Sequence, residues 1–427
     1  MAIALIIVFI VGYAFIAFEH TVKINKAATA LITGCLCWTI YILCFDDHHL
    51  VNEQLQHHLG ELSGILFFLL AAMTIVELID AHQGFDLITT RITQSKKTHL
   101  LWIISFISFL LSAVLDNLTT TIVMVSLIRK LVKNDSDRLW FCGMIVIASN
   151  AGGAWSPIGD VTTTMLWIGG QISTVSIITR VLVPSLVSMM VPLTILSFIL
   201  KGKVERPEQK TEGGNLVVTG TQKMIVLIAG LSILILVPVF KTITHLPPYI
   251  GILMGLGILW LITEIIHGKM DDADKDHLSV VHALRKTDTP SILFFLGILI
   301  CIAALQSTGI LTNVATWMSN NLGNESVVAA TLGVLSAIVD NVPLVAAAQG
   351  MYTLEQYPMD HNFWIFLAYC TGTGGSALII GSAAGVAAMG IEKISFGWYF
   401  KRFTLLVLIG YACGIGIYLL QNLLFFQ

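Results

Sequence analysis

The feature that most constrains this sequence is a series of apolar runs, each about twenty residues long, with short polar segments between them. A helix of that length crosses roughly 30 Å of hydrocarbon. Of all residues, 56% are hydrophobic and only 11% are charged. A soluble chain of this length could not bury so much apolar surface, so we expect an all-α, polytopic membrane protein in a lipid bilayer.

Charge, the N-terminus and the cysteines limit the choice of function. The formal net charge of −3 does not indicate a nucleic-acid partner. The N-terminus lacks the basic start and the cleavage site of a signal peptide, so we interpret it as a first span. The seven cysteines form no CxxC pair, which argues against a metal centre or a disulfide framework. We expect no cofactor.

Two of the apolar runs contain the dipeptide Asp-Asn, at Asp116-Asn117 and again at Asp340-Asn341. Each is followed by a glycine-rich break in the next apolar run, at 149–160 and at 371–382. The two copies lie about 220 residues apart. A repeated pair of interrupted hydrophobic segments is the best pointer in a sequence to the binding site of a transporter.

The run at 100–128 is too short for two full membrane crossings at about 1.5 Å per residue. Both of its flanks are basic, with Arg91, Lys96 and Lys97 before it and Arg129, Lys130, Lys133 and Arg138 after it. Basic loops stay in the cytoplasm, so the chain leaves on the side where it entered. We therefore predict a re-entrant helical hairpin with Asp116-Asn117 at its tip.

The second Asp-Asn run, 326–353, has flanks without lysine or arginine, at 312–326 and 352–362. This hairpin should therefore enter from the outside, opposite to the first. Opposite charge signatures around equivalent hairpins are typical of two inverted-topology repeats.

The expected organisation follows from this repeat. The first repeat covers residues 1–200, with three spans, the hairpin 100–128, a broken helix at 139–178 and a span at 181–200. A cytoplasmic linker occupies 201–222. The second repeat covers 223–427, with spans at 223–240, 248–266 and 289–308, the hairpin 326–353, a broken helix at 363–390 and a final span at 403–425. The third span is expected at 61–83, after a polar loop with His48, His49, His57 and His58, which we interpret as solvated; sensing of pH or metal binding is the alternative.

The hairpin tips and helix breaks should meet near the membrane midplane and form a cation site. The candidate groups for proton or cation exchange are the carboxylates of Asp116, Asp340, Asp160 and Glu77. The candidate cation ligands are Asn117, Asn341, Ser112, Ser336, Ser149, Asn150, Ser156, Thr373 and Ser376. The residues expected to break the helices are Gly152, Gly153, Pro157, Gly159, Gly374 and Gly375. Oxygen ligands without nearby lysine or arginine suit a hard ion such as Na⁺ or Li⁺, and a buried carboxylate binds either a proton or such a cation.

Less specific interpretations remain for some of these residues. Glu77 or Asp160 could simply hydrogen-bond a neighbouring helix, and the glycines could serve only close helix packing. Gly159-Asp160 is also similar to the Gly-Asp of intramembrane aspartyl proteases. For the twice-occurring Asp-Asn pair a functional role is the default, since ionisable residues inside membranes are costly.

Together these motifs resemble the NhaD-type sodium/proton antiporters, in a superfamily that includes dicarboxylate/sodium symporters and arsenite efflux permeases. The resemblance covers nearly the whole chain, and 72–82, Asp116-Asn117 and 149–160 carry it. The dicarboxylate symporters have Ser-Asn-Thr at their hairpin tips. Here Asp116 and Asp340 stand at the serine position, with Leu118 and Val342 at the threonine position. The Thr-Pro-Ile-Gly motif of the superfamily appears as Ser156-Pro157-Ile158-Gly159.

The resemblance implies an antiporter that exchanges cytoplasmic Na⁺ or Li⁺ for external H⁺. It also implies a homodimer, a scaffold region, a transport region that moves as an elevator, and a bacterial inner membrane. The alternatives are a sodium-coupled dicarboxylate symporter or an arsenite permease of the same superfamily, and, from another class, an intramembrane aspartyl protease that uses Asp160. A passive channel is disfavoured, because hairpins paired with broken helices suit alternating access better than a continuous pore.

Overall fold

The computed structural model describes residues 1–427 except 18, 90–91, 93, 208–217, 269–271 and 427. Within these residues the regular secondary structure is helical, apart from one isolated bridge between Lys96 and Lys203. Eight of the described helices are long and apolar enough to cross a membrane. The prediction of an all-α polytopic membrane protein is therefore confirmed.

The first half of the described chain contains ten helices. They are α1 (Ala2–Ala17), α2 (Glu19–Val22), α3 (Lys26–Cys44), α4 (His48–Ala81), α5 (Asp86–Thr89), α6 (Lys97–Leu115), α7 (Asn117–Leu131), α8 (Asp135–Ala154), α9 (Val161–Ile168) and α10 (Thr174–Ile199).

The second half begins with α11 after the polar linker. Its helices are α11 (Gly220–Thr244), α12 (Pro248–His267), α13 (Asp272–His277), α14 (Val280–Lys286), α15 (Thr289–Ser307), α16 (Ile310–Leu322), α17 (Glu325–Leu335), α18 (Asn341–Met351), α19 (Asn362–Gly374), α20 (Ala383–Glu392), α21 (Phe396–Tyr399), the π-helical turn η1 (Phe400–Thr404) and α22 (Leu405–Phe425).

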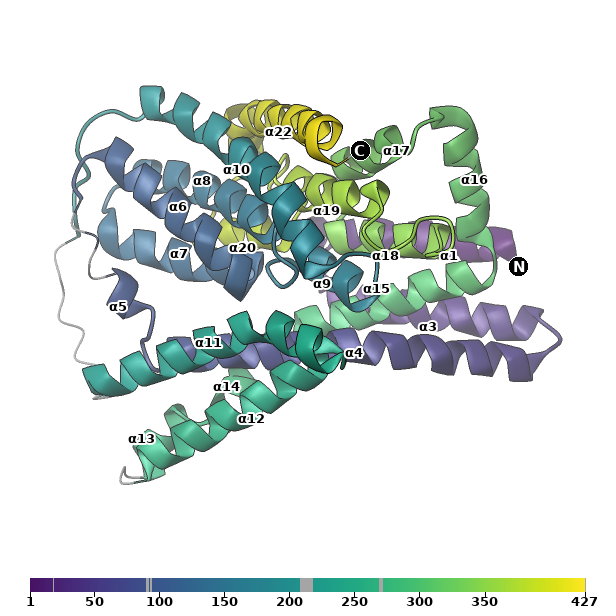
Figure 1. Ribbon diagram of the computed structural model, residues 1–427, viewed down its shortest axis with the longest axis horizontal. Helices are drawn as coiled ribbons and strands as arrows, with labels where there is room; N and C mark the ends of the chain where they lie inside the picture. The colour runs from purple at the N-terminus through teal and green to yellow at the C-terminus, as the bar shows by residue number, and fades with distance from the viewer. Residues whose placement is uncertain (18, 90–91, 93, 208–217, 269–271, 427) are drawn as a thin grey trace.

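These helices form two groups, which are visible in Figure 1. In one group α3 packs against α1 and α15, and the long helix α4 packs against α12 and α15, with α11 beside α12. We call these six helices the framework. In the other group α6 packs on α8, α17 on α19, α10 on α22 and α20 on α7. We call α6–α10 and α17–α22 the hairpin group, because it holds both Asp-Asn segments.

Both Asp-Asn segments join two helices of a hairpin. Asp116 alone separates α6 from α7, and its positive φ of 80° allows the chain to reverse within one residue. In the second hairpin α17 ends at Leu335, and a short turn at 336–339 leads to Asp340 before α18 begins. The tips therefore lie at Asp116 and Asp340, where the sequence predicts them.

The two halves repeat the same contacts between hairpin and broken helix. The hydroxyl of Ser112 donates to the carbonyl oxygen of Ser149 at 2.5 Å. The hydroxyl of Ser336 lies 3.3 Å from the equivalent carbonyl oxygen, that of Thr371, but makes its shorter bond, of 2.6 Å, to the Gly333 carbonyl of its own hairpin helix. A side chain at Gly152 would collide with the Phe109 carbonyl, and one at Gly374 with the Gly333 carbonyl, so both glycines permit close helix approach.

Several boundaries differ from the predicted ones. α4 begins at His48, so the segment predicted as a solvated loop is helical, with the Asp47 side chain accepting a bond from the Leu50 amide at 3.0 Å. α9 ends at Ile168 and α10 begins at Thr174, so the first broken helix is shorter than 139–178. α16 occupies 310–322, which was expected only as a flank. Part of the linker 201–222 lies outside the described residues.

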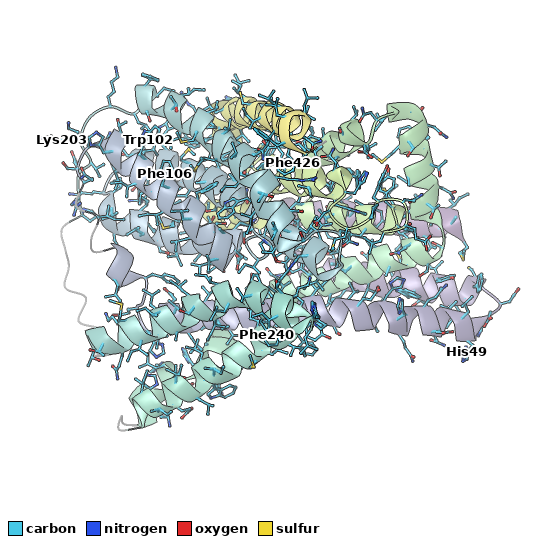
Figure 2. All side chains as sticks on the ribbon, in the orientation of Figure 1. His49, Trp102, Phe106, Lys203, Phe240 and Phe426 are labelled. Carbon is cyan, nitrogen blue, oxygen red and sulfur yellow. The ribbon has the colours of Figure 1, made fainter. Side chains whose placement is uncertain are left out.

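The two ends of the molecule differ in charge. His49 belongs to the segment without lysine or arginine, and Lys203 to the basic segment after α10. Figure 2 shows these two side chains at opposite ends of the long axis. This arrangement agrees with a long axis that crosses the membrane and a Lys203 end that faces the cytoplasm.

Candidate functional site

The ends of eight helices form the walls of the site. α6, α8, α17 and α19 end there, and α7, α9, α18 and α20 begin there. Helix N-termini carry partial positive charge and favour carboxylates, whereas the carbonyl ends favour cations. Asp116, Asp160 and Asp340 are the N-cap residues of α7, α9 and α18. Such a set of discontinuous helices is suited to a charged substrate.

Asp160 is the centre of the hydrogen-bond network. Its side chain is 1% exposed, and its Oδ2 accepts the amide of Asn117 at 2.6 Å. The amide of Asn341 lies 3.3 Å from the same oxygen. Oδ1 accepts the Thr162 backbone N–H at 2.9 Å and the Thr162 hydroxyl at 2.8 Å. One buried carboxylate is therefore held by the asparagines of both hairpin tips.

Asn150 connects the two broken helices. Its Oδ1 accepts the Asn117 amide at 3.0 Å. Its Nδ2 donates to the hydroxyls of Ser376 and Ser382, each at 2.8 Å. The five residues of this network are each at most 4% exposed: Asp160, Asn117, Asn150, Ser376 and Ser382. The network therefore crosses from the first half of the molecule to the second.

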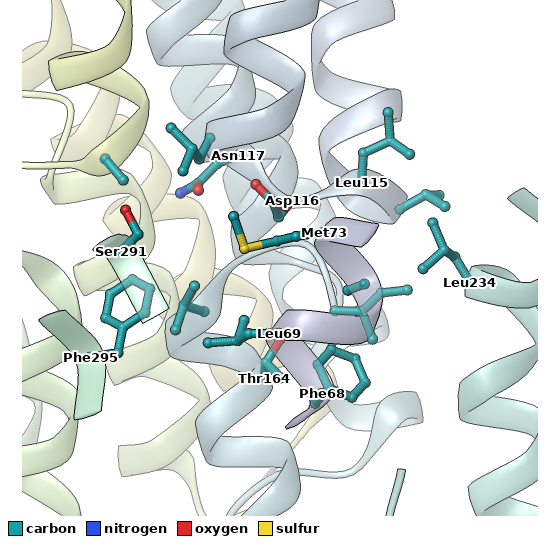
Figure 3. Close-up of a pocket in the computed structure, with 16 residues that line it drawn as sticks. Phe68, Leu69, Met73, Leu115, Asp116, Asn117, Thr164, Leu234, Ser291 and Phe295 are labelled. Carbon is teal, nitrogen blue, oxygen red and sulfur yellow. The ribbon is translucent and has the colours of Figure 1, made fainter. Parts of the chain in front are cut away.

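Asp116 caps its own helix and stays outside this network. Its Oδ1 accepts the Thr119 backbone N–H at 2.8 Å, and its Oδ2 accepts the Thr119 hydroxyl at 2.8 Å. It also lines a small pocket with Met73 of α4 and Ser291 of α15, which Figure 3 shows. Asp116 thus lies beside framework helices α4 and α15.

Asp340 makes a different contact. Its Oδ2 lies 3.7 Å from the ammonium of Lys26, the first residue of α3. Its Oδ1 is buried without a hydrogen-bond partner, and its side chain does not cap α18. The two tips are therefore equivalent in sequence but not in their contacts.

Glu77 is not part of the site. It lies on α4, where its Oε1 is 3.8 Å from the ammonium of Lys286, the last residue of α14. The fourth candidate carboxylate is thus placed beside a basic residue rather than beside the helix breaks.

The remaining candidate ligands divide by what their hydroxyls contact. Ser156 donates to the Ala113 carbonyl at 2.5 Å, and Thr373 donates to the Tyr369 carbonyl of its own helix at 2.6 Å. The Ser149 hydroxyl is buried without a hydrogen-bond partner. Ser112 joins the first hairpin to the first broken helix, whereas Ser336 bonds mainly to Gly333 of its own hairpin and only weakly to Thr371 of the second broken helix. Among the hydroxyl candidates, Ser376 alone bonds to the asparagine network within the described residues.

The expected helix-breaking residues lie at the two breaks. α8 ends just before Trp155, and Pro157 and Gly159 fall between α8 and α9. A Cβ at Gly159 would lie 2.6 Å from the Ser112 carbonyl, and one at Gly381 would lie 2.5 Å from the Ala337 carbonyl. Gly153 and Gly375 sit against the carbonyls of Gly159 and Gly381. The breaks thus need glycine because backbone approaches backbone.

Comparison with known proteins identifies the chain. The citrate transporter family model matches residues 5–364. Sodium/proton antiporter 2 of Arabidopsis thaliana is 45% identical over 97% of this chain and 98% of its own length. Sodium/proton antiporter 1 of the same plant is 48% identical over 100% of this chain and 73% of its own length. The Na⁺/H⁺ antiporter NhaD of Vibrio parahaemolyticus is 32% identical over 91% of this chain and 98% of its own length.

The chain belongs to the citrate transporter family, on its NhaD-type antiporter branch. The predicted resemblance is therefore confirmed. The protein is a multi-pass membrane transporter and not an enzyme.

Two residues at the site of this transporter were not predicted from its sequence. Ser382 bonds Asn150 and caps α20, as Asp160 caps α9. The signal was available, because aligning Gly152-Gly153 with Gly374-Gly375 places Ser382 opposite Asp160. Lys26 was missed because it lies in the framework, and only the fold brings it to Asp340.

Cavities reach the hairpin group of this transporter from both ends of α15. One has a volume of about 260 Å³ and includes Ser291 of α15 and Leu118 beside the first tip. The other has a volume of about 720 Å³ and includes Gln306 of α15, Gln349 of α18 and His58 of α4. The first lies near the start of α15 and the second near its end. A cavity thus lies between framework and hairpin residues on each side of the site.

Proposed function

We propose that the protein exchanges Na⁺ or Li⁺ for H⁺, and that Asp160 is the principal exchanging carboxylate. The observation that carries this proposal is the convergence of both tip asparagines on the buried Asp160. A carboxylate at this depth requires a proton, a cation or hydrogen-bond donors as compensation. Exchange is the replacement of one of these partners by another. Na⁺, Li⁺ and H⁺ are then the transported ions, and no cofactor takes part.

The amides supply the compensation when no cation is bound. Asn117 and Asn341 donate their N–H groups to Asp160 in the described conformation. Half a turn of either amide presents its oxygen instead, because an amide has an acceptor on one side and donors on the other. Na⁺ at Asp160 would then have carboxylate and amide oxygens as ligands, with serine hydroxyls at Asn150 behind them. The bound proton would take the place of that ion on the return.

Alternating access is our proposed mechanism. It is supported by the cavities at the two ends of α15 and by the separation into framework and hairpin group. We further propose two inverted-topology repeats, supported by the equivalent contacts of Ser112 and Ser336. We also propose that the hairpin group moves as an elevator and that the protein is a homodimer. We place it in a bacterial inner membrane; because two relatives are from Arabidopsis, a plant membrane is the alternative.

Anion transport is the competing function, because the matching family model is described as a citrate transporter. A carboxylate substrate would need cationic groups or a neutral tip. Within the described residues, no lysine or arginine contacts Asp160 or Asp116, and Lys26 is already paired with Asp340. The negative charge of three carboxylates attracts a cation and repels an anion.

A proton-flux assay in inside-out vesicles with an acidic interior tests this function. We expect Na⁺ and Li⁺ to dissipate the gradient, and succinate, citrate and arsenite to leave it unchanged. Asp160→Asn should abolish the response, because the variant has no charge to exchange. Glu77→Gln is the matched control and should retain exchange within about twofold, since its pair with Lys286 is partly exposed.

The outcomes separate the alternatives. Dissipation by an anion but by no cation would support the symporter or permease instead. Normal exchange by Asp160→Asn, with failure of Asp116→Asn or Asp340→Asn, would show that a tip carboxylate carries the exchange.

A further inference from the structure

One ion pair connects the framework directly to the site. The Lys26 ammonium at the start of α3 lies 3.7 Å from Asp340 Oδ2 at the tip of the second hairpin. In the described part of the chain, neither Asp116 nor Asp160 has a salt bridge to a basic side chain. The equivalent carboxylates of the two hairpins therefore differ, and only one has a cation of the protein itself beside it.

The surroundings of Asp340 leave room for exchange of that cation. Asp340 is the N-cap residue of α18, yet its carboxylate does not bond to the helix, and its Oδ1 is buried without a partner. Asp116 instead uses both oxygens on Thr119. An unpartnered buried oxygen is costly, so the Asp340 carboxylate has unused capacity for a cation.

The contacts of Lys26 leave its ammonium free to move away from Asp340. Its ammonium lies 4.4 Å from the centre of the Phe294 ring, which stabilises a cation over its face. Its backbone N–H donates to Glu19 Oε1 at 3.1 Å, so a second carboxylate stands beside the base of its flexible side chain. A distance of 3.7 Å to Asp340 is an ion pair without close hydrogen-bond geometry.

The pair also lies at an approach to the site. Lys26, Glu19 and Asp340 line one cavity of about 50 Å³, together with Tyr13. Lys26 and Glu19 line the adjoining cavity of about 260 Å³, which reaches Leu118 beside the first tip. Lys26 therefore lines both cavities on this side of the tips, where a cation would approach Asp340.

We propose that Lys26 is a positioning residue for the exchange, which acts as a tethered competitor for the Asp340 carboxylate. This inference rests on the proposed cation exchange. The ammonium occupies Asp340 when no ion is bound, and a cation binds at that tip only after the lysine withdraws towards Glu19. Because Lys26 belongs to the framework, it competes only while the second tip lies beside the start of α3. Lys26 therefore raises the concentration of cation that is needed on this side of the membrane to half-saturate transport.

Kinetics of Lys26→Gln and Lys26→Arg in inside-out vesicles test the proposal. Lys26→Gln should lower the apparent KM for Na⁺ roughly three- to tenfold, since it removes a partly buried charge pair that competes with the ion. Its maximal rate should fall, because the lysine no longer replaces the departing ion. Lys26→Arg keeps the competing charge and can still stack on the Phe294 ring, so its apparent KM for Na⁺ should stay within about twofold of that of the natural protein. Lys23→Gln, an exposed lysine three residues away, is the matched control and should change nothing.

If Lys26→Gln does not fold, a measurement on the natural protein still tests the proposal. Acylation of amines by a water-soluble reagent, read by mass spectrometry of the Lys26 peptide, should increase when Na⁺ is added, and the Lys23 peptide should not change. An unchanged or higher KM for a well-folded Lys26→Gln, or Lys26 acylation that Na⁺ does not alter, would overturn the proposal. If the natural protein shows no cation exchange at all, the proposed function itself fails first.

Discussion

Asn150 is the residue on which the two halves depend most directly. It bonds Asn117 from the first hairpin and two serines of the second break. An asparagine can do this because it offers an acceptor and two donors on one short side chain. Its position in the last turns of α8 puts it directly before the glycines that break the helix.

Asn150→Ala should therefore raise the apparent KM for Na⁺ at least about tenfold, because buried partners lose their hydrogen bonds and the Asn117 amide is no longer oriented. Uptake of Na⁺ into vesicles over a range of concentrations measures this. Asn313→Ala, at an exposed position of α16, is the control with the same change of side chain. An Asn150→Ala protein of normal abundance with an unchanged KM would show that the network only stabilises the fold.

The sequence identified the residue types of this site but not their division of roles. Both tips were predicted from the repeated Asp-Asn, and the structure brings both to the breaks. Asp116 and Asp340 were predicted as equivalent, since a repeat carries no information on their different neighbours. Asp160 is central because it accepts hydrogen bonds from Asn117 and Asn341, which are 43 and 181 residues distant from it in the sequence. Contacts of that range depend on how the hairpins close and cannot be inferred from local spacing.

At the scale of the helices, the breaks are built from glycines that face backbone. Gly152 and Gly374 lie against the carbonyls of Phe109 and Gly333 in the equivalent hairpin helices. A methyl group at either position has no space, because the neighbour is backbone and cannot rotate away. The repeat of this contact explains why the glycine pair recurs in both halves.

Gly152→Ala and Gly374→Ala should each destabilise the protein by about 1–3 kcal/mol, the usual cost of overpacking. Thermal unfolding of the purified protein in detergent measures the effect as a lower Tm. Gly257→Ala on α12 is the control, because a Cβ there meets nothing within 4 Å. Equal Tm values for Gly152→Ala and Gly257→Ala would mean that the hairpin can move away from the break without loss.

The helical segments that were not predicted, the start of α4 and the whole of α16, lack long apolar runs. α4 extends back to His48 because Asp47 caps a polar but helix-compatible segment, which a search for spans does not detect. α16 buries Ile310, Leu311, Ala315 and Met318 on one face and is too short to span. Gly309 and Gly323, both with positive φ, enclose it and were the available signal.

At the scale of the whole molecule, α15 is the framework helix that faces both cavities. Ser291 lies in the cavity near its start and Gln306 in the cavity near its end. Their separation of fifteen positions in the sequence corresponds to about 22 Å along the helix axis. Ile298, midway between them, is 1% exposed. Labels placed along α15 can therefore measure access from both sides of the protein.

Single cysteines at Ser291, Ile298 and Gln306 test alternating access, in a background in which the seven native cysteines are replaced and exchange is retained. A membrane-impermeant maleimide should modify Ser291→Cys from the cytoplasmic side and Gln306→Cys from the opposite side. Ile298→Cys should not react from either. Under conditions that drive exchange, Na⁺ and H⁺ should change the two reaction rates in opposite directions, because closing one cavity opens the other when the hairpin group moves against a fixed α15. Reaction rates that rise and fall together would instead indicate a continuous pore, and rates that never change would indicate a fixed hairpin group.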